Sequence, residues 1–131
     1  MIKFDADAIT ISMLDDMDLR PGMLVLDVGC GYGSVSRMVA ERVGPNGRVT
    51  AMDREMSHLA QAEELTIESG LRNIDYVRGD LTSFEFASES YDAIVGRRVL
   101  MYVPDAKHVL RRLACLLKTG GILAFQEHVN H

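Results

Sequence analysis

Short apolar segments alternate along the chain with longer segments whose apolar residues recur at helical spacing. The short segments are rich in Val, Ile and Leu and nearly unbroken, which is typical of parallel strands buried on both faces. The predicted strands, in chain order, are 24–28, 48–53, 73–80, 91–96 and 122–127. The predicted helices are about 5–18, 34–43, 55–69 and 104–117. Strand–helix alternation of this kind indicates a doubly wound, Rossmann-like α/β fold with a parallel sheet.

Turn residues support these boundaries. Gly44-Pro45-Asn46-Gly47 ends the second predicted helix, and Gly70 ends the third. In that third helix we expect Met56, Leu59 and Ile67 to share the apolar side. Residues 81–90 are too few and too polar for a full crossover helix, so we expect an irregular connection there.

The first predicted strand ends in an acid and is followed by alternate glycines. Asp27 stands near its carboxyl end, Gly29, Gly31 and Gly33 follow, and Cys30 lies between the first two glycines. Glycines permit a sharp turn and close approach of a ligand. The spacing G-x-G-x-G differs from the G-x-G-x-x-G of dinucleotide-binding turns, and a carboxylate repels phosphates but attracts cations. The loop therefore suits S-adenosylmethionine, a sulfonium without phosphate, better than a nicotinamide dinucleotide.

A second acid ends the next strand. Asp53 follows Gly33 by twenty residues, where a carboxylate of a nucleotide-binding α/β unit accepts hydrogen bonds from ribose hydroxyls. Aspartate also caps helices, so an N-cap for the following helix is the alternative.

The nine residues 25–33, Val-Leu-Asp-Val-Gly-Cys-Gly-Tyr-Gly, resemble the first motif of class I S-adenosylmethionine-dependent methyltransferases. Gly79-Asp80-Leu81 resembles the third cofactor motif of that family, residues 91–103 the fourth, and Lys118-Thr119-Gly120-Gly121 with the next strand the last. The resemblance implies strand order 3-2-1-4-5, helices on both faces and a cofactor-binding core over about 23–127.

The resemblance also implies roles for individual residues. Asp53 and Arg54 would lie at the ribose, the Asp80 carboxylate would accept from the adenine amino group, and the Leu81 amide would donate to a ring nitrogen. Local capping is the alternative for Asp80. Arg97 either approaches the cofactor carboxylate or is a solvated surface charge. Met56 and His58 are both candidates to cover the adenine.

Composition narrows the remaining possibilities. The chain has 131 residues, which suits a single domain, and a formal net charge of −5, which argues against a nucleic-acid partner. We expect no membrane span and no secretion signal. Two cysteines, Cys30 and Cys115, make a disulfide framework improbable and favour a reducing cytoplasm. His128 and His131 lack further ligands, so we expect no metal site.

The predicted function is methyl transfer from S-adenosylmethionine to a small-molecule acceptor by in-line displacement, as in the ubiquinone/menaquinone-type members of the family. Tyr102, Glu127 and His128 are base candidates if the acceptor must lose a proton, although a surface role is the simpler interpretation of each. The alternatives are a non-catalytic cofactor-binding or assembly module and an NAD(P)-dependent oxidoreductase. Family members normally continue past the fifth strand, so we expect a homodimer or a further carboxyl-terminal region to cover that edge.

Overall fold

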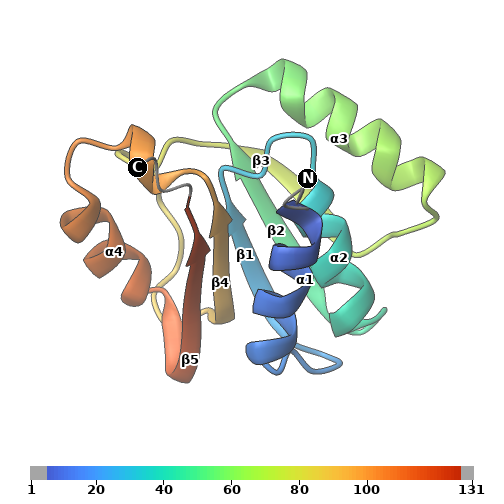
Figure 1. The fold of residues 1–131 in the computed structure, drawn as a ribbon, viewed down its shortest axis with the longest axis horizontal. Coiled ribbons are helices and arrows are strands. Elements are labelled where there is room, and N and C mark those ends of the chain that lie inside the picture. Colours follow the sequence, from blue (N-terminus) through green and yellow to red (C-terminus); the bar gives the residue numbers. More distant parts are fainter. Residues whose placement is uncertain (1–5, 128–131) are drawn as a thin grey trace, which may run out of the picture.

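The computed structural model describes residues 6–127, in which five strands form one parallel sheet with helices on both faces (Figure 1). The strands are β1 (Leu24–Val28), β2 (Arg48–Asp53), β3 (Ile74–Arg78), β4 (Tyr91–Arg97) and β5 (Leu117–Gln126). The helices are α1 (Ala6–Asp16), α2 (Ser34–Val43), α3 (Met56–Glu68) and α4 (Ala106–Ala114), with a short 3-10 helix, η1, at Leu100–Tyr102. The strand order is β3-β2-β1-β4-β5, which confirms the predicted order and the α/β fold class.

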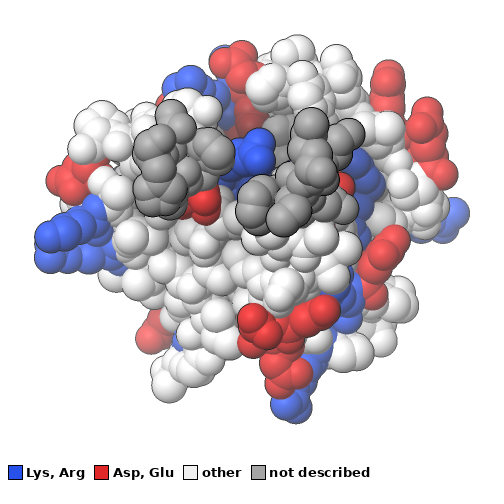
Figure 2. Space-filling model, in the orientation of Figure 1, with Lys and Arg blue, Asp and Glu red and all other residues white. Residues whose placement is uncertain are grey.

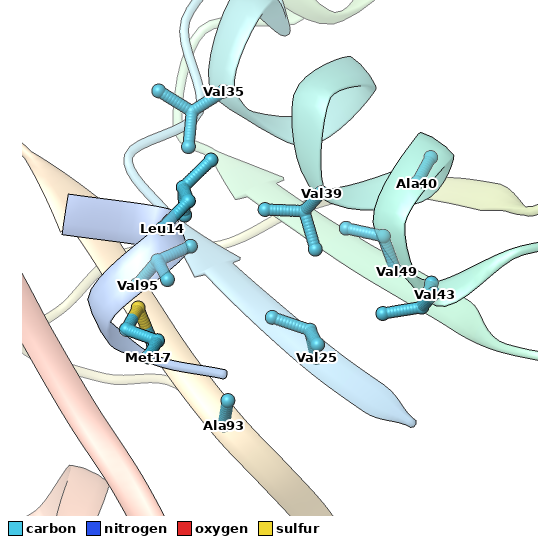
Figure 3. Close-up of a cluster of buried hydrophobic side chains, with 10 residues drawn as sticks. All are labelled: Leu14, Met17, Val25, Val35, Val39, Ala40, Val43, Val49, Ala93 and Val95. Atoms are coloured by element: carbon cyan, nitrogen blue, oxygen red, sulfur yellow. The ribbon is translucent and has the colours of Figure 1, made fainter. Parts of the chain in front are cut away.

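Alternate residues of β1 feed two separate cores, as the pleat of a strand requires. Val25 joins a cluster with Val49 and Val95 of the neighbouring strands, covered by side chains of α1 and α2 (Figure 3). Leu26 points to the opposite face and packs in the cluster that α4 covers. Val25 and Leu26 are both fully buried, and β1 is the middle strand of the sheet. The apolar segment 24–28 of the sequence therefore forms the central strand of the molecule.

The face covered by α4 has less helical cover than the other. Helices α1, α2 and α3 lie on one side of the sheet and α4 alone lies on the other (Figure 1). No helix connects β3 to β4, as predicted, and Phe84 of this connection is buried against the sheet instead. Arg112 of α4 holds the connection in place by donating to the carbonyls of Thr82 and Phe84.

Two local predictions were wrong. The buried side of α3 consists of Leu59, Ala62 and Thr66, while Met56 and Ile67 are exposed. Thr66 can be buried because its hydroxyl bonds to the Ala62 carbonyl and to the Tyr76 hydroxyl of β3.

The other error concerns the last helix and strand. Helix α4 ends at Ala114, and β5 begins at Leu117, which pairs with Tyr91. The expected turn at 118–121 is an irregularity within β5, because the register shifts between Tyr91 and Ala93. Pairing with β4 thus decides the boundary that apolar spacing alone placed too late.

Candidate active site

A pocket of about 640 Å³ opens at the carboxyl ends of β1, β2 and β3. One wall consists of the glycine loop after β1 and the ends of β2 and β3, and the other wall is the segment 98–104 that follows β4. Ligands of open parallel α/β sheets bind outside the carboxyl ends of the strands. They bind next to the central strand, at the point where the strand order reverses. The volume lies in the usual range for small-molecule sites.

The three glycines of the loop have different surroundings, although all have positive φ. A side-chain carbon at Gly29 would lie 2.0 Å from Cγ1 of Val99, and one at Gly33 would lie 2.4 Å from the Tyr76 hydroxyl. At Gly31, which lines the pocket, no atom lies within 4 Å of that position. Gly29 and Gly33 therefore permit close packing within the protein, and Gly31 leaves space for a ligand.

Asp53 connects the end of β2 to the glycine loop. Its Oδ2 accepts from the Gly31 amide at 2.9 Å, and its Oδ1 accepts from the Glu55 amide at 2.9 Å and lies 3.3 Å from Nδ1 of His58. The side chain is 11% exposed and borders the pocket. Asp53 does not cap α3, whose N-cap position is Glu55. The carboxylate thus fixes the loop and keeps further acceptor capacity toward the pocket.

Asp80 and Leu81 border the pocket where β3 ends, with Arg54 beside them. Thr82 donates to Oδ1 of Asp80 from its amide, at 2.8 Å, and from its hydroxyl, at 2.7 Å. These bonds hold the pKa of Asp80 below its ordinary value, so the carboxylate is ionised. The local capping that we gave as the alternative is present, and it occupies one oxygen of the carboxylate.

Asp27 lies beneath the loop and is not a lining residue of the pocket. It is 1% exposed, and the Ser36 hydroxyl donates to its Oδ2 at 2.6 Å. Burial raises the pKa of Asp27 to about 7, although the Ser36 bond and the charge of Arg97 act in the other direction. The carboxylate is buried because the central strand is buried on both faces, and the role of Asp27 in cofactor binding stays a prediction.

Three further predicted residues lie outside the pocket lining. Arg97 is held by α1, where it donates to Asp7 at 2.8 Å and to the Thr10 hydroxyl at 3.1 Å. Cys30 donates its amide to the Met52 carbonyl, and burial raises the pKa of its thiol well above the ordinary range. Gly33 precedes α2 and packs as described above. The contacts described for Arg97, Cys30 and Gly33 are thus with other parts of the protein and not with the pocket.

Residues 98–104 form the second wall, and most of them belong to the segment 91–103, whose resemblance to the fourth family motif implied a place beside the cofactor and the substrate. The wall contains Arg98 and the side chains around η1, and its position is fixed by bonds to the end of β5. The Arg98 amide donates to the Gln126 carbonyl at 2.8 Å, and the amides of Val99 and Leu100 donate to the carboxylate of Glu127. The sequence signal for this wall was its resemblance to the fourth motif, whereas the bonds that fix the wall come from the distant end of β5.

His58 also borders the pocket, where its ring stacks at a tilt on Tyr32 with centroids 4.9 Å apart. Met56 is 57% exposed and is not a lining residue, so of the two residues considered for the adenine, His58 is the one at the pocket.

Of the base candidates, Tyr102 lines the pocket and Glu127 is engaged with backbone amides, while His128 lies outside the described residues, as does His131. Within residues 6–127, no group of three His, Cys, Asp or Glu side chains is arranged to hold a metal ion. No helix in the described part of the chain has the length and apolarity to cross a membrane.

A family model described as a methyltransferase domain matches residues 19–131, which is most of the chain. The chain belongs to the S-adenosylmethionine-dependent methyltransferase family. Among its relatives, a demethylmenaquinone methyltransferase of Listeria monocytogenes is 37% identical over 108 residues, covering 82% of this chain and 46% of the relative. An aklanonic acid methyltransferase of a Streptomyces species is 36% identical over 117 residues, covering 89% and 53%.

Solved structures of the family have the same fold. A coclaurine N-methyltransferase, crystallised with N-methylheliamine and S-adenosylhomocysteine, superposes with a TM-score of 0.83 at 27% identity, covering 95% of this chain and 38% of that one. The chain spans about half the length of the curated relatives it matches. The methyltransferase fold and cofactor motifs thus account for nearly all of this chain, and the rest of each relative has no counterpart in it.

Proposed function

We propose that this chain binds S-adenosylmethionine in the pocket and transfers its methyl group to a small-molecule acceptor. The observation that carries the proposal is Asp53, a pocket carboxylate that is bonded to the amide of Gly31, the glycine with open space beside it. A ribose placed against Asp53 would donate its hydroxyls to the remaining acceptor sites of the carboxylate. The methionine part would then extend along Gly29 and Gly31, on the side of β1.

The adenine would lie toward the end of β3. Asp80 has one carboxylate oxygen outside its Thr82 bonds, which suits the adenine amino group, a donor only. The Leu81 amide would donate to a ring nitrogen, and Arg54 and His58 would border the nucleoside. Asp27 would act from beneath the loop through its bond to Ser36, and Arg97 through its hold on α1, rather than by direct contact.

Charge on the pocket wall favours this cofactor over a dinucleotide. Asp53, Glu55 and Asp80 all border the same wall, and their carboxylates would repel a pyrophosphate. S-adenosylmethionine has no phosphate and carries a sulfonium. Family membership also argues against the oxidoreductase alternative.

Methyl transfer requires an acceptor atom in line with the sulfur–methyl bond. That atom supplies an electron pair to the methyl carbon while the carbon–sulfur bond breaks and its electrons stay on sulfur. Holding the two reactants in line can supply much of the acceleration, so the site needs no nucleophile of its own.

The names of the relatives and the charge of this chain both support a small molecule as the methyl acceptor. The relatives are named for demethylmenaquinone and aklanonic acid, which are small molecules. Acidic and basic side chains are interspersed on the face in Figure 2 without a continuous basic area, and the net charge is −5, which does not suit a nucleic-acid acceptor.

Isothermal titration of the purified chain with S-adenosylhomocysteine, with NADH as the control ligand, tests the proposal. We expect heat of binding with the first alone, and an affinity at least tenfold weaker in Asp53→Ala, because one charged acceptor is worth roughly 1.5–3 kcal/mol. Binding of NADH in preference, or of neither ligand, would contradict the proposal.

A cofactor-binding module without transferase activity is the second candidate, because the chain matches only about half of each relative. Incubation with radiolabelled S-adenosylmethionine and a panel of phenols, carboxylates and amines distinguishes the two. Cofactor binding without label transfer to any acceptor would favour the module.

A further inference from the structure

The two walls of the pocket differ in charge. Every acid that lines the pocket lies on the wall formed by the ends of β2 and β3. The wall after β4 has no acid and presents one cation among apolar and aromatic residues: Arg98, Val99, Tyr102, Val103 and Pro104. If the nucleoside takes the acidic wall, as proposed above, the methyl acceptor faces this second wall.

Arg98 is exposed and has no counter-ion in the described part of the chain. The neighbouring residue Arg97 pairs with Asp7. Arg54 also lines the pocket, and its Nε lies 3.9 Å from Oε1 of Glu55. No carboxylate of residues 6–127 lies within ion-pair distance of Arg98. A guanidinium presented to a pocket in this way matches the geometry of a carboxylate, with two parallel donors.

The backbone of Arg98 is held in an unfavourable conformation. Its φ of 57° lies in the left-handed region, which costs energy for any residue with a Cβ. The bond from its amide to Gln126 and the bonds of the next two amides to Glu127 hold it there. Glycine would adopt this conformation at a lower free-energy cost than arginine does. Asp18 and Glu89 have a similar φ, but of these three residues only Arg98 lines the pocket, and strained residues cluster at functional sites.

We propose that Arg98 binds a carboxylate of the methyl acceptor, while Val99, Tyr102 and Val103 contact an apolar body. This rests on the proposed function and names its acceptor class: an apolar, carboxylate-bearing small molecule. In the transfer step the acceptor's nucleophilic atom forms a bond to the methyl carbon, the carbon–sulfur bond breaks onto sulfur, and any proton on the nucleophile leaves to solvent. The carboxylate on Arg98 stays ionised and unreacted.

The test is calorimetric titration of protein saturated with S-adenosylhomocysteine, using a naphthalene carboxylate and its neutral amide of the same shape. We expect the wild type to prefer the acid about tenfold, because the charge-assisted pair exists only for the acid. The preference disappears in Arg98→Gln and in Arg98→Gly. It persists in Arg111→Gln, the same chemical change on an exposed arginine of α4 outside the pocket.

Folding of the variants is checked by thermal melts. Arg98→Gly relieves the left-handed strain, so we expect its melting temperature to rise by roughly 2–6 °C while acid preference is lost. Equal affinity for acid and amide, or binding of neither, by wild type that binds S-adenosylhomocysteine contradicts this proposal alone. A loss of S-adenosylhomocysteine affinity in Arg98→Gln would assign the arginine to the cofactor and also contradict it. Wild type without S-adenosylhomocysteine binding would contradict the proposed function itself.

Discussion

The glycines of the loop after β1 differ in purpose: some permit close packing in the folded protein, and one leaves space for a ligand. Gly29 and Gly33 are needed because protein atoms occupy the space where a side chain would be, whereas Gly31 has open space beside it. Their spacing in the sequence is uniform and carries no sign of this division. The neighbours that cause it, Val99 and Tyr76, come from distant segments of the chain.

This division predicts that two matched substitutions differ in their cost to stability. Gly31→Ala should cost only the strain of a left-handed residue, about 1–2 kcal/mol of unfolding free energy, and should weaken S-adenosylhomocysteine binding. Gly29→Ala should cost a further 1–3 kcal/mol or so, because its Cβ would overlap Val99. Urea unfolding and calorimetry measure the two quantities. Unchanged affinity in Gly31→Ala would argue against the placement of the cofactor.

The charge of Asp27 depends on the fold, because burial of its side chain raises its pKa. Its pKa is about 7 in the folded protein and near 4 when unfolded, so between these pH values the native state holds one proton more than the unfolded state. The contribution of this group to stability is therefore greatest below pH 4, falls as pH rises toward 7 and then levels off. Ser36, Arg97 and Asp53 are the groups that act on it, the first two lowering and the last raising the pKa.

Relative to Asp27→Asn, the wild type should lose on the order of 3–4 kcal/mol of unfolding free energy between pH 4 and pH 7. Urea unfolding at four pH values measures this difference. Asp75→Asn is the control, since Arg48 holds the pKa of that exposed carboxyl below its ordinary value and the opposite pH trend follows. A constant difference between wild type and Asp27→Asn would show that Asp27 is ionised throughout.

Among the elements, the connection between β3 and β4 contains no helix, and contacts to α4 hold it in place instead. Arg112 donates to the Thr82 and Phe84 carbonyls at 3.2 and 2.9 Å, and its guanidinium lies 4.4 Å from the centre of the Phe84 ring. Phe84 is in turn buried in the core on this face. One side chain therefore joins a helix, an irregular segment and the sheet.

Arg112→Ala should lower the unfolding free energy by about 1–3 kcal/mol, because two carbonyls lose a charged donor and the Phe84 ring loses its cover. Arg111→Ala, an exposed neighbour on the same helix, should change it by less than about 0.5 kcal/mol. Guanidinium unfolding of the two variants makes the comparison. Equal effects would mean that Arg112 acts only as a surface charge.

At the scale of the whole molecule, β5 is an edge strand with apolar exposure. Among residues 6–127 it pairs with β4 alone, and Ile122 is 41% exposed. An exposed edge of this length is a template for pairing with another chain. We propose that this chain associates with a second copy of itself through the outer edge of β5.

Sedimentation velocity over a hundredfold concentration range tests the association. We expect the average mass to rise with concentration, and Ile122→Lys to shift the rise to higher concentration, since a charged residue discourages edge pairing. Ile67→Lys, the same change at an exposed residue of α3, controls for charge alone. A constant monomer mass would contradict the proposal.

Local apolar pattern and turn chemistry specify the glycine loop, the acids at the strand ends and the strands apart from the start of β5, so these features could be predicted without the fold. Asp53 and Asp80 were found in this way, and both border the pocket. The burial of Asp27, the hold of α1 on Arg97 and the position of Arg98 at the pocket became clear from the folded chain alone. The physical reason is that burial, ion pairing and pocket walls depend on segments brought together from distant parts of the chain, which no local pattern encodes.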